Sequence, residues 1–282
     1  MKIKVSEIFY SLQGEGRHVG TPSVFLRTFG CNFTCDGFGS HLTDYLKNNT
    51  RHEVDPSLYK NYEDLPLVRK GCDSYASWDP RFKHLSKFYE VEELAQKCVE
   101  LIPNGLFDNK THLIITGGEP LLGWQKSLSK LIDILRPRHI TFETNGTQIL
   151  SKDLADTIIE KCITVTFSVS AKLPSSGEKF ETAINPKAVE SYYLYLDSNK
   201  YTDIYLKFVI GQKTDIDDVK RAIKRYEDAE AFFGGQDIYL MPVGGTVESY
   251  LNEKEVADLA LENGYRFSPR LQVGLYKNAW GT

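Results

Sequence analysis

The chain has 282 residues, is 41% hydrophobic and carries a formal net charge of −4, so it can bury a full core. The acidic balance argues against a nucleic-acid-binding surface, and no apolar run is long enough to span a bilayer. The amino-terminal residues lack the apolar core of a signal peptide, so we expect a cytoplasmic protein. The five cysteines are an odd number, which indicates metal ligation or core packing rather than a disulfide framework.

Strand patterns open the chain over residues 5–12 and 23–29, with a glycine-rich turn between them. Residues 36 to about 90 lack clear periodicity, and we interpret them as an ordered insertion because they contain a candidate ligand. From residue 91 onward, helix-like and strand-like patterns alternate. The expected helices are 91–102, 124–135, 154–161, 185–196, 215–226 and 247–263. The expected strands are 112–116, 138–142, 163–170, 203–210, 237–241 and 265–267.

This alternation predicts an α/β fold in which a parallel sheet with right-handed crossovers forms a barrel. Polar and glycine-rich residues follow the predicted strands, at the end where barrel active sites lie. We find no linker that divides the chain. We therefore expect one domain over residues 1–282, with an insertion at about 36–90.

Three cysteines form the first candidate constellation. Cys31 and Cys35 follow the second strand directly, and Cys72 lies beyond most of the insertion. Phe38 occupies the position where a compact Cys-x3-Cys-x2-Cys motif would place its third thiol. Three thiolates that converge in space can hold three irons of a four-iron cluster and leave the fourth iron open. A zinc site or core packing would explain the same residues. The remaining cysteines end helix-like segments and are expected in the core: Cys98 and Cys162.

A second constellation follows the strand predicted over 112–116. Gly117 and Gly118 expose backbone groups and allow a ligand to approach closely, and Glu119 can bind an ammonium group. An ordinary turn between a strand and a helix would also explain this sequence, and it is the more common interpretation of an isolated match.

Later strand ends carry a third constellation, made of hydroxyls, a carboxylate and an amine. Its members suit a ligand that has amino, carboxylate and ribose groups, although solvation of strand ends and helix capping would also explain them. The residues are Glu143, Ser168, Ser170 and Lys172.

The fourth constellation is Gln13, Gly14 and Glu15 together with Arg27. An arginine that points from a buried strand towards a cavity pairs well with a carboxylate. Glutamine and glutamate side chains can together recognise the donor and acceptor edge of a heterocycle. A structural ion pair is the alternative role for Arg27.

Taken together, these motifs resemble the radical S-adenosylmethionine (SAM) superfamily and, within it, the 7-carboxy-7-deazaguanine synthase family. The resemblance covers nearly the whole chain in the expected order. It departs from the family pattern where the insertion splits the cysteine motif, and at Gln272, where the family tail commonly has histidine. The segments that carry it are 12–16, 25–27, 30–32, 72–74, 116–120, 143–146 and 268–272.

The resemblance implies a partial (β/α)6-type barrel and a [4Fe–4S] cluster held by Cys31, Cys35 and Cys72. SAM would chelate the open iron through its amino and carboxylate groups, and the Ser74 hydroxyl would bind Mg²⁺. The residues implied to bind SAM are Gly117, Gly118, Glu119, Glu143, Ser168, Ser170 and Lys172. The residues implied to bind the substrate are Gln13, Gly14, Glu15, Arg27 and Thr116.

The implied reaction converts 6-carboxy-5,6,7,8-tetrahydropterin into 7-carboxy-7-deazaguanine and releases ammonia. One-electron cleavage of SAM would give a 5′-deoxyadenosyl radical, which abstracts hydrogen from C6 before the ring contracts. We also expect an electron donor such as flavodoxin or ferredoxin and a homodimer, with neither nucleic acid nor membrane as a partner. Two alternatives stay open: another radical SAM enzyme, such as a glycyl-radical-type activase, and a non-catalytic iron–sulfur or zinc module.

Overall fold

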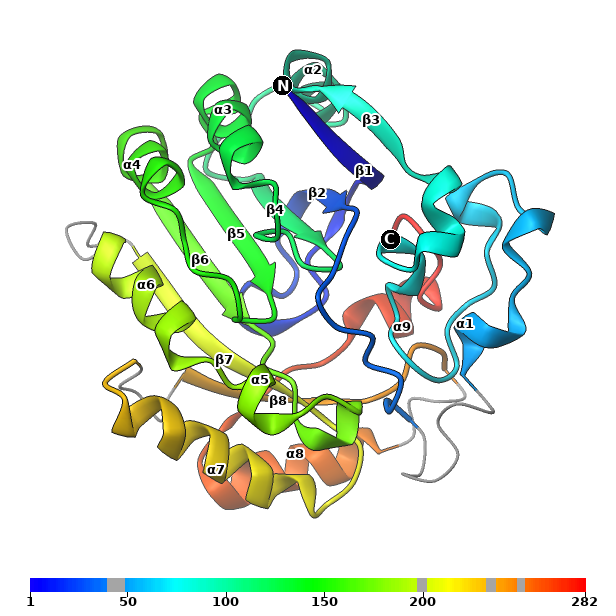
Figure 1. Ribbon diagram of the computed structural model, residues 1–282, viewed down its shortest axis with the longest axis vertical. Helices are drawn as coiled ribbons and strands as arrows, with labels where there is room; N and C mark the ends of the chain where they lie inside the picture. The colour runs from blue at the N-terminus through cyan, green and yellow to red at the C-terminus, as the bar shows by residue number, and fades with distance from the viewer. Residues whose placement is uncertain (40–48, 197–201, 232–236, 248–251) are drawn as a thin grey trace.

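The computed structural model describes residues 1–39, 49–196, 202–231, 237–247 and 252–282. Its nine-stranded sheet has the order β3-β1-β2-β4-β5-β6-β7-β8-β9 and curves into an incomplete barrel (Figure 1). β1 runs antiparallel to β2 and β3, whereas each pair from β2 to β9 is parallel. The strands are β1 (Lys2–Leu12), β2 (Pro22–Thr28), β3 (Lys87–Glu90), β4 (His112–Gly117), β5 (His139–Thr144), β6 (Thr164–Val169), β7 (Thr202–Ile210), β8 (Ile238–Pro242) and β9 (Arg266–Phe267).

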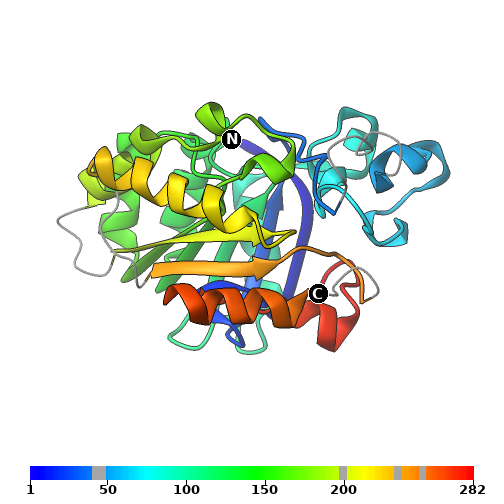
Figure 2. The same ribbon diagram turned by 90° about the horizontal axis from the view of Figure 1, so that it is seen from below.

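The longer helices cover the outer face of the curved sheet (Figure 2). Each is amphipathic, as α3 shows by burying Leu128, Leu131 and Ile132 against the strands. None of the described helices combines the length and apolar character that crossing a membrane requires. The helices are α1 (Thr50–Glu53), α2 (Val91–Glu100), α3 (Gln125–Leu135), α4 (Lys152–Lys161), α5 (Phe180–Ala183), α6 (Pro186–Leu196), α7 (Asp215–Asp228), α8 (Glu253–Asn263) and α9 (Leu271–Tyr276).

The predicted α/β alternation and the partial barrel are confirmed, and Cys98 and Cys162 are buried in the main core as expected. The helix expected over 247–263 begins at Glu253, and residues 248–251 lie outside the described part. Sequence periodicity missed β3, α1, α5 and α9. These elements have only four to six residues, so they are too short to show a period.

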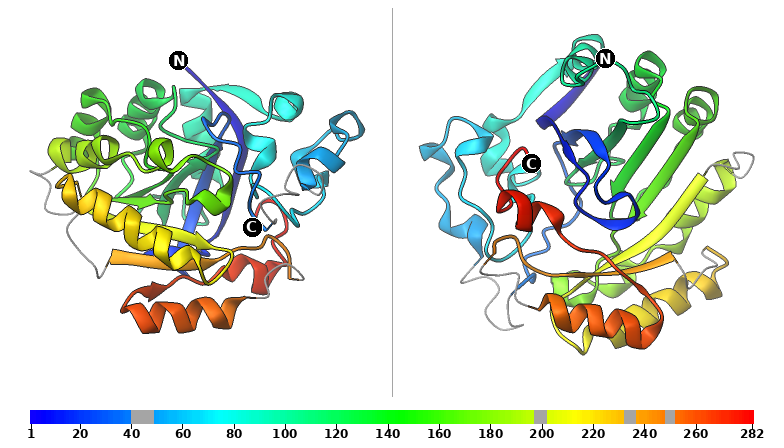
Figure 3. Two further views of the ribbon diagram at one scale, coloured as in Figure 1. Left: turned by 60° about the horizontal axis from the view of Figure 1, so that its bottom comes forward. Right: turned by 180° about the vertical axis from the view of Figure 1, so that it is seen from behind.

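The insertion and the carboxyl-terminal segment lie together on the open side of the barrel (Figure 3). The described part of the insertion has its own apolar cluster, which includes Tyr62 and Tyr75. Trp280 of the tail meets the Tyr62 ring edge-on at 4.9 Å, and its indole N–H donates to the Leu65 carbonyl at 2.7 Å. The tail therefore packs on the insertion, and both are held beside the strand ends.

Three histidines pack together at the amino-terminal end of the barrel strands. His112 and His139 begin β4 and β5, and their rings stack with centroids 4.7 Å apart. His18 meets His112 edge-on at 4.9 Å. Burial, together with the neighbouring His18 and His139, lowers the pKa of His112 to about 4.

This cluster makes stability depend on pH. An unfolded histidine takes up a proton below about pH 6.5, whereas folded His112 stays neutral until about pH 4. The free energy of unfolding should therefore fall as the pH drops through this window. We expect His112→Phe to reduce that fall by about 1 kcal/mol, and exposed His84→Phe to leave it unchanged. Denaturant unfolding across the window measures the slope, and an unaltered slope in His112→Phe would contradict the assignment.

Candidate active site

A cavity of about 240 Å³ lies at the carboxyl ends of the barrel strands, between the barrel, the insertion and the tail. Strand register explains how distant residues meet there: Arg27 of β2 pairs with Thr116 of β4. Parallel strands end at the same edge, so their terminal side chains converge. The predicted site residues that line the cavity are Gln13, Gly14, Glu15, Arg27, Cys31, Cys35, Cys72, Ser74, Thr116, Gly117, Gly118, Glu143, Ser170 and Lys172.

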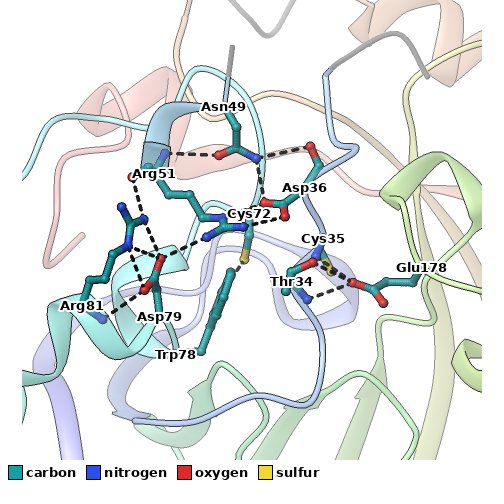
Figure 4. Close-up of polar contacts among 10 residues, drawn as sticks. All are labelled: Thr34, Cys35, Asp36, Asn49, Arg51, Cys72, Trp78, Asp79, Arg81 and Glu178. Atoms are coloured by element: carbon teal, nitrogen blue, oxygen red, sulfur yellow. Dashed lines mark hydrogen bonds and ion pairs between the residues drawn. The ribbon is translucent and has the colours of Figure 1, made fainter. Parts of the chain in front are cut away.

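The three predicted cysteine ligands share one apolar pocket, where Cys31 and Cys72 pack against Cys35 and Phe33. The backbone N–H of Phe33 donates to Cys31 Sγ at 3.4 Å. The Trp78 indole N–H donates to Cys72 Sγ at 3.3 Å, as Figure 4 shows. In the described part of the chain, no three His, Cys, Asp or Glu side chains are arranged to hold a single metal ion.

Burial controls the protonation of these thiols. It raises the pKa of Cys31 to about 12, and it raises the pKa of Cys35 and Cys72 above the ordinary value. Iron binds the thiolate form, so cluster assembly releases these protons, and N–H donors stabilise the sulfur anions that result. Three free thiols in an apolar pocket that supplies N–H donors fit an iron–sulfur cluster.

The turn after β4 packs directly on the loop that carries Cys31. The Glu119 N–H donates to the Gly30 carbonyl at 2.7 Å. A Cβ atom on Gly118 would lie 2.4 Å from that carbonyl oxygen and 2.7 Å from the Cβ of Cys31. Gly118 is therefore required for the close approach of two backbones beside the cluster ligands, as well as being a candidate for SAM binding.

We expect Gly118→Ala to push the Cys31 loop away from the turn. It should lower the free energy of unfolding by about 1–3 kcal/mol, as overpacking does, and reduce the iron retained after reconstitution. Gly274→Ala in α9 is the matched control, because a Cβ there meets open space. Iron content and denaturant unfolding measure both effects. Equal iron content in the two variants would show that the close approach does not position Cys31.

Two predicted SAM-binding residues lie beneath the cavity lining. The Glu119 carboxylate is fully buried and accepts hydrogen bonds from Leu121 N (3.1 Å), Thr144 Oγ1 (2.8 Å) and Asn145 N (2.7 Å). It thus joins the β4 turn to the end of β5, and burial raises its pKa. Ser168 is also fully buried, and its hydroxyl has no hydrogen-bond partner among the described residues.

Alternating charges cross the cavity as a buried network. Lys207 Nζ contacts Glu15 Oε2 at 2.8 Å and Glu143 Oε2 at 3.0 Å. Arg270 contacts the other oxygen of Glu15 at 3.2 Å and Asp73 at 2.5 Å. Although burial alone would raise the pKa of Glu15, Lys207 and Arg270 hold it well below its usual range. Glu15 is therefore an ionised carboxylate facing the cavity.

Two predicted substrate residues and the tail complete this network. Gln13 Nε2 donates to Glu143 Oε1 at 3.0 Å, so Glu143 belongs with the predicted substrate residues rather than standing apart. Gln272 Nε2 donates to Glu15 Oε1 at 2.8 Å. The Gly14 carbonyl accepts from the Leu271 N–H at 2.9 Å, which fixes the tail against the first strand.

Arg27 forms an ion pair at the cavity wall. Its Nε donates to Glu7 Oε2 at 2.8 Å, while its terminal nitrogens have no partner among the described residues. Burial raises the pKa of Glu7, although Arg27 opposes that rise. Arg27 can therefore form a structural ion pair through Nε and contact a substrate through its terminal nitrogens.

Sequence reasoning missed four residues that shape this cavity, and some of them left a signal. Lys207 is a lone cation within an apolar strand, and a lysine is rarely fully buried unless it is paired. Glu7 similarly occupies an inward position of β1. Trp78 and Arg270 lie in segments without periodicity, so nothing local indicated their partners.

Comparison with known proteins was made on the whole chain. A 7-carboxy-7-deazaguanine synthase of Halobacterium salinarum is 31% identical, and the match covers 98% of this chain and 91% of that protein. One from Bacteroides thetaiotaomicron is 66% identical over 55% of this chain and 58% of its own length. The crystal structure of QueE from Escherichia coli covers 96% of this chain with a TM-score of 0.55 at 18% identity, and 95% of that chain is covered. No protein-family model matches.

A partial barrel with three cysteines gathered at its strand ends defines the class of radical SAM enzymes. Whole-length similarity then narrows the class, and the chain belongs to the 7-carboxy-7-deazaguanine synthase family. Membership in this family implies a [4Fe–4S] cluster and SAM as cofactors.

Proposed function

We propose that the chain contracts the ring of 6-carboxy-5,6,7,8-tetrahydropterin to give 7-carboxy-7-deazaguanine, with release of ammonia. The observation that carries this proposal is that the three thiols, Glu15 and Arg27 line the same cavity. The thiols suit a cluster, and the other two side chains suit a substrate that has both a carboxylate and a heterocyclic donor edge.

We assign Cys31, Cys35 and Cys72 as the cluster ligands. When bound, the cluster and SAM supply the electron and the hydrogen-abstracting radical that the reaction needs. The chain supplies position: Gly117 and Gly118 present open backbone to the methionine end of SAM. Glu119 is assigned to the same methionine end, where it acts from beneath the cavity lining. The residues assigned to the remainder of SAM are Ser168, Ser170 and Lys172, and Glu143, which Gln13 contacts, is assigned to SAM and substrate together. Ser170 and Lys172 line the cavity, with Lys172 Nζ 2.9 Å from Ser170 Oγ.

Substrate recognition rests on complementary charges and hydrogen bonds. Ionised Glu15 can accept from the neighbouring N–H groups of the pterin ring edge, and Gln272 Oε1 is a buried acceptor without a partner among the described residues. The terminal nitrogens of Arg27 can bind the substrate carboxylate in a bidentate manner. Gln13, Gly14 and Thr116 complete the wall on which the ring lies.

We also infer that a magnesium ion binds beside these groups. Mg²⁺ prefers hard oxygen ligands, and the Ser74 hydroxyl lies at the cavity. We assign Ser74 as the protein ligand that brings Mg²⁺ to the substrate carboxylate. There the ion would orient that group during ring contraction.

We also infer the wider setting of the enzyme. The chain is one domain with an insertion, acts in the cytoplasm as a homodimer, and takes electrons from a protein such as flavodoxin or ferredoxin. The single continuous sheet supports the first inference, and the cavity of about 240 Å³ supports a small-molecule substrate.

Substitution of Arg27 tests the substrate assignment. In Arg27→Met we expect kcat/KM for the pterin to fall at least about 100-fold, because a charged hydrogen bond to the substrate carboxylate is lost. Cluster content should stay at the wild-type level, because Arg27 does not contact the thiols. An activase acting on a protein would not need this side chain. Unchanged turnover of the pterin in Arg27→Met would therefore overturn the assignment.

A further inference from the structure

The insertion splits the cysteine motif, so its fold must bring the two parts of the motif back together. Cys35 and Cys72 are separated by a long segment, yet they meet in one pocket. The stretch formed by Asn49 and the short helix α1 (Thr50–Glu53) lies between the residues that follow Cys35 and those that precede Cys72. Backbone hydrogen bonds run from Thr50 N to the Lys70 carbonyl (3.1 Å) and from Gly71 N to the Phe38 carbonyl (2.8 Å).

Asn49 fixes the position of this stretch. Its Nδ2 donates to Asp36 Oδ1 at 2.9 Å and to the Asp36 carbonyl at 3.3 Å. Gly71 has a φ of +92°, and a Cβ atom there would lie 2.4 Å from Asn49 Nδ2. The residue before Cys72 must therefore be small and left-handed, so that the chain can pass against Asn49.

Arg51 connects the two sides of the motif (Figure 4). Its guanidinium binds Asp36, the neighbour of Cys35, through Nε to Oδ1 (2.7 Å) and Nη2 to Oδ2 (2.6 Å). Its Nη1 binds Asp79 Oδ2 at 3.1 Å. The Arg51 and Asp79 side chains are 13% and 4% exposed, so solvent screens this contact weakly.

Beyond Asp79, the contacts of Arg51 lead to the thiol of Cys72. Trp78 precedes Asp79, and its ring centre lies 5.2 Å from the Arg51 guanidinium. The Trp78 indole N–H then donates to Cys72 Sγ at 3.3 Å. Arg51 is thus the side chain through which Asp36, beside Cys35, is linked to the hydrogen bond on Cys72.

We propose that Arg51 is a positioning residue for the iron–sulfur cluster. By binding both Asp36 and Asp79, Arg51 holds the two parts of the split motif together and keeps the Trp78 indole in place to donate to Cys72. The inference rests on the proposed function, because it takes Cys72 as a cluster ligand. A hydrogen bond to a ligating sulfur raises the reduction potential of a cluster, so the Arg51 side chain sets that potential through Trp78.

The test compares reduction potentials of the reconstituted full-length protein by EPR-monitored titration. Trp78→Phe keeps the ring and removes the N–H, so its potential should become more negative. At a fixed potential, the ratio of reduced to oxidised cluster should fall at least about threefold. Arg51→Met should shift the potential in the same direction. The double variant should shift no further than Trp78→Phe, because both changes act on one hydrogen bond.

Two variants separate positioning from simple structural support. Arg69→Met removes another arginine–carboxylate pair of the insertion, but an exposed one, and should leave the potential unchanged. Arg51→Lys keeps the charge without the planar fork and should show the shift if Arg51→Met does not fold. A lower melting temperature with an unshifted potential in the Arg51 variants would overturn the inference. Full cluster content in Cys72→Ala would instead overturn the ligand assignment on which it rests.

Discussion

Cys72→Ala is expected to lower formation of the deazaguanine product at least about 10³-fold, the scale seen when one member of a cooperating catalytic group is removed. The reason is that Cys72 is the only thiol that the described insertion brings to Cys31 and Cys35. Without it, a second iron of the cluster has no protein ligand. Iron and sulfide content after anaerobic reconstitution, together with product formation, measures the effect.

Cys98→Ala supplies the control, because Cys98 is fully buried in the main core and does not line the cavity. It should lose some stability, as a small core truncation does, while keeping the cluster. If Cys72→Ala and Cys98→Ala retained equal iron and equal activity, Cys72 would be a packing residue and the third ligand would have to be sought elsewhere.

Lys207→Met should disrupt both stability and substrate binding. Removing one partner of a buried ion pair costs about 3–5 kcal/mol, because the carboxylates of Glu15 and Glu143 would be left without their shared cation. We expect the free energy of unfolding at neutral pH to fall by about that amount, and KM for the pterin to rise. Denaturant unfolding and steady-state kinetics measure the two consequences.

The same variant should alter the dependence of stability on pH. The pKa of folded Glu15 lies well below its usual range, despite burial, because Lys207 and Arg270 favour the ionised form. That stabilisation is present above the unfolded pKa of about 4.3 and is lost as the pH falls. In Lys207→Met, the free energy of unfolding should therefore decrease less as the pH falls. Lys254→Met, on an exposed pair, should leave stability nearly unchanged. Equal effects in both variants would show that the buried network stabilises nothing.

Local sequence information was sufficient for the barrel and for most of the cavity lining. The strand from Pro22 to Thr28 is an apolar run that ends beside Cys31, so its position as a buried strand and the place of the thiols follow from one pattern. Glycine pairs and polar residues at strand ends marked the rest of the edge, because parallel strands all present their carboxyl ends to one side.

Contacts between segments far apart in sequence could not be predicted in this way. Nothing near Glu15 indicates that Lys207 and Arg270 will hold it ionised, since those partners come from β7 and the tail. The link from Asp36 through Arg51 to Asp79 likewise arises only when the insertion folds back on itself. Pairings of this kind depend on tertiary structure, which the periodicity of a single segment does not report.

An anaerobic turnover assay tests most directly whether this chain is a ring-contracting enzyme. Reconstituted protein would be mixed with SAM, Mg²⁺, a reductant and 6-carboxy-5,6,7,8-tetrahydropterin, and both 5′-deoxyadenosine and 7-carboxy-7-deazaguanine would be quantified. We predict that both products form and increase together with enzyme concentration. Formation of 5′-deoxyadenosine without the deazaguanine by fully loaded protein would contradict the proposed substrate, and formation of neither would contradict radical SAM catalysis by this chain.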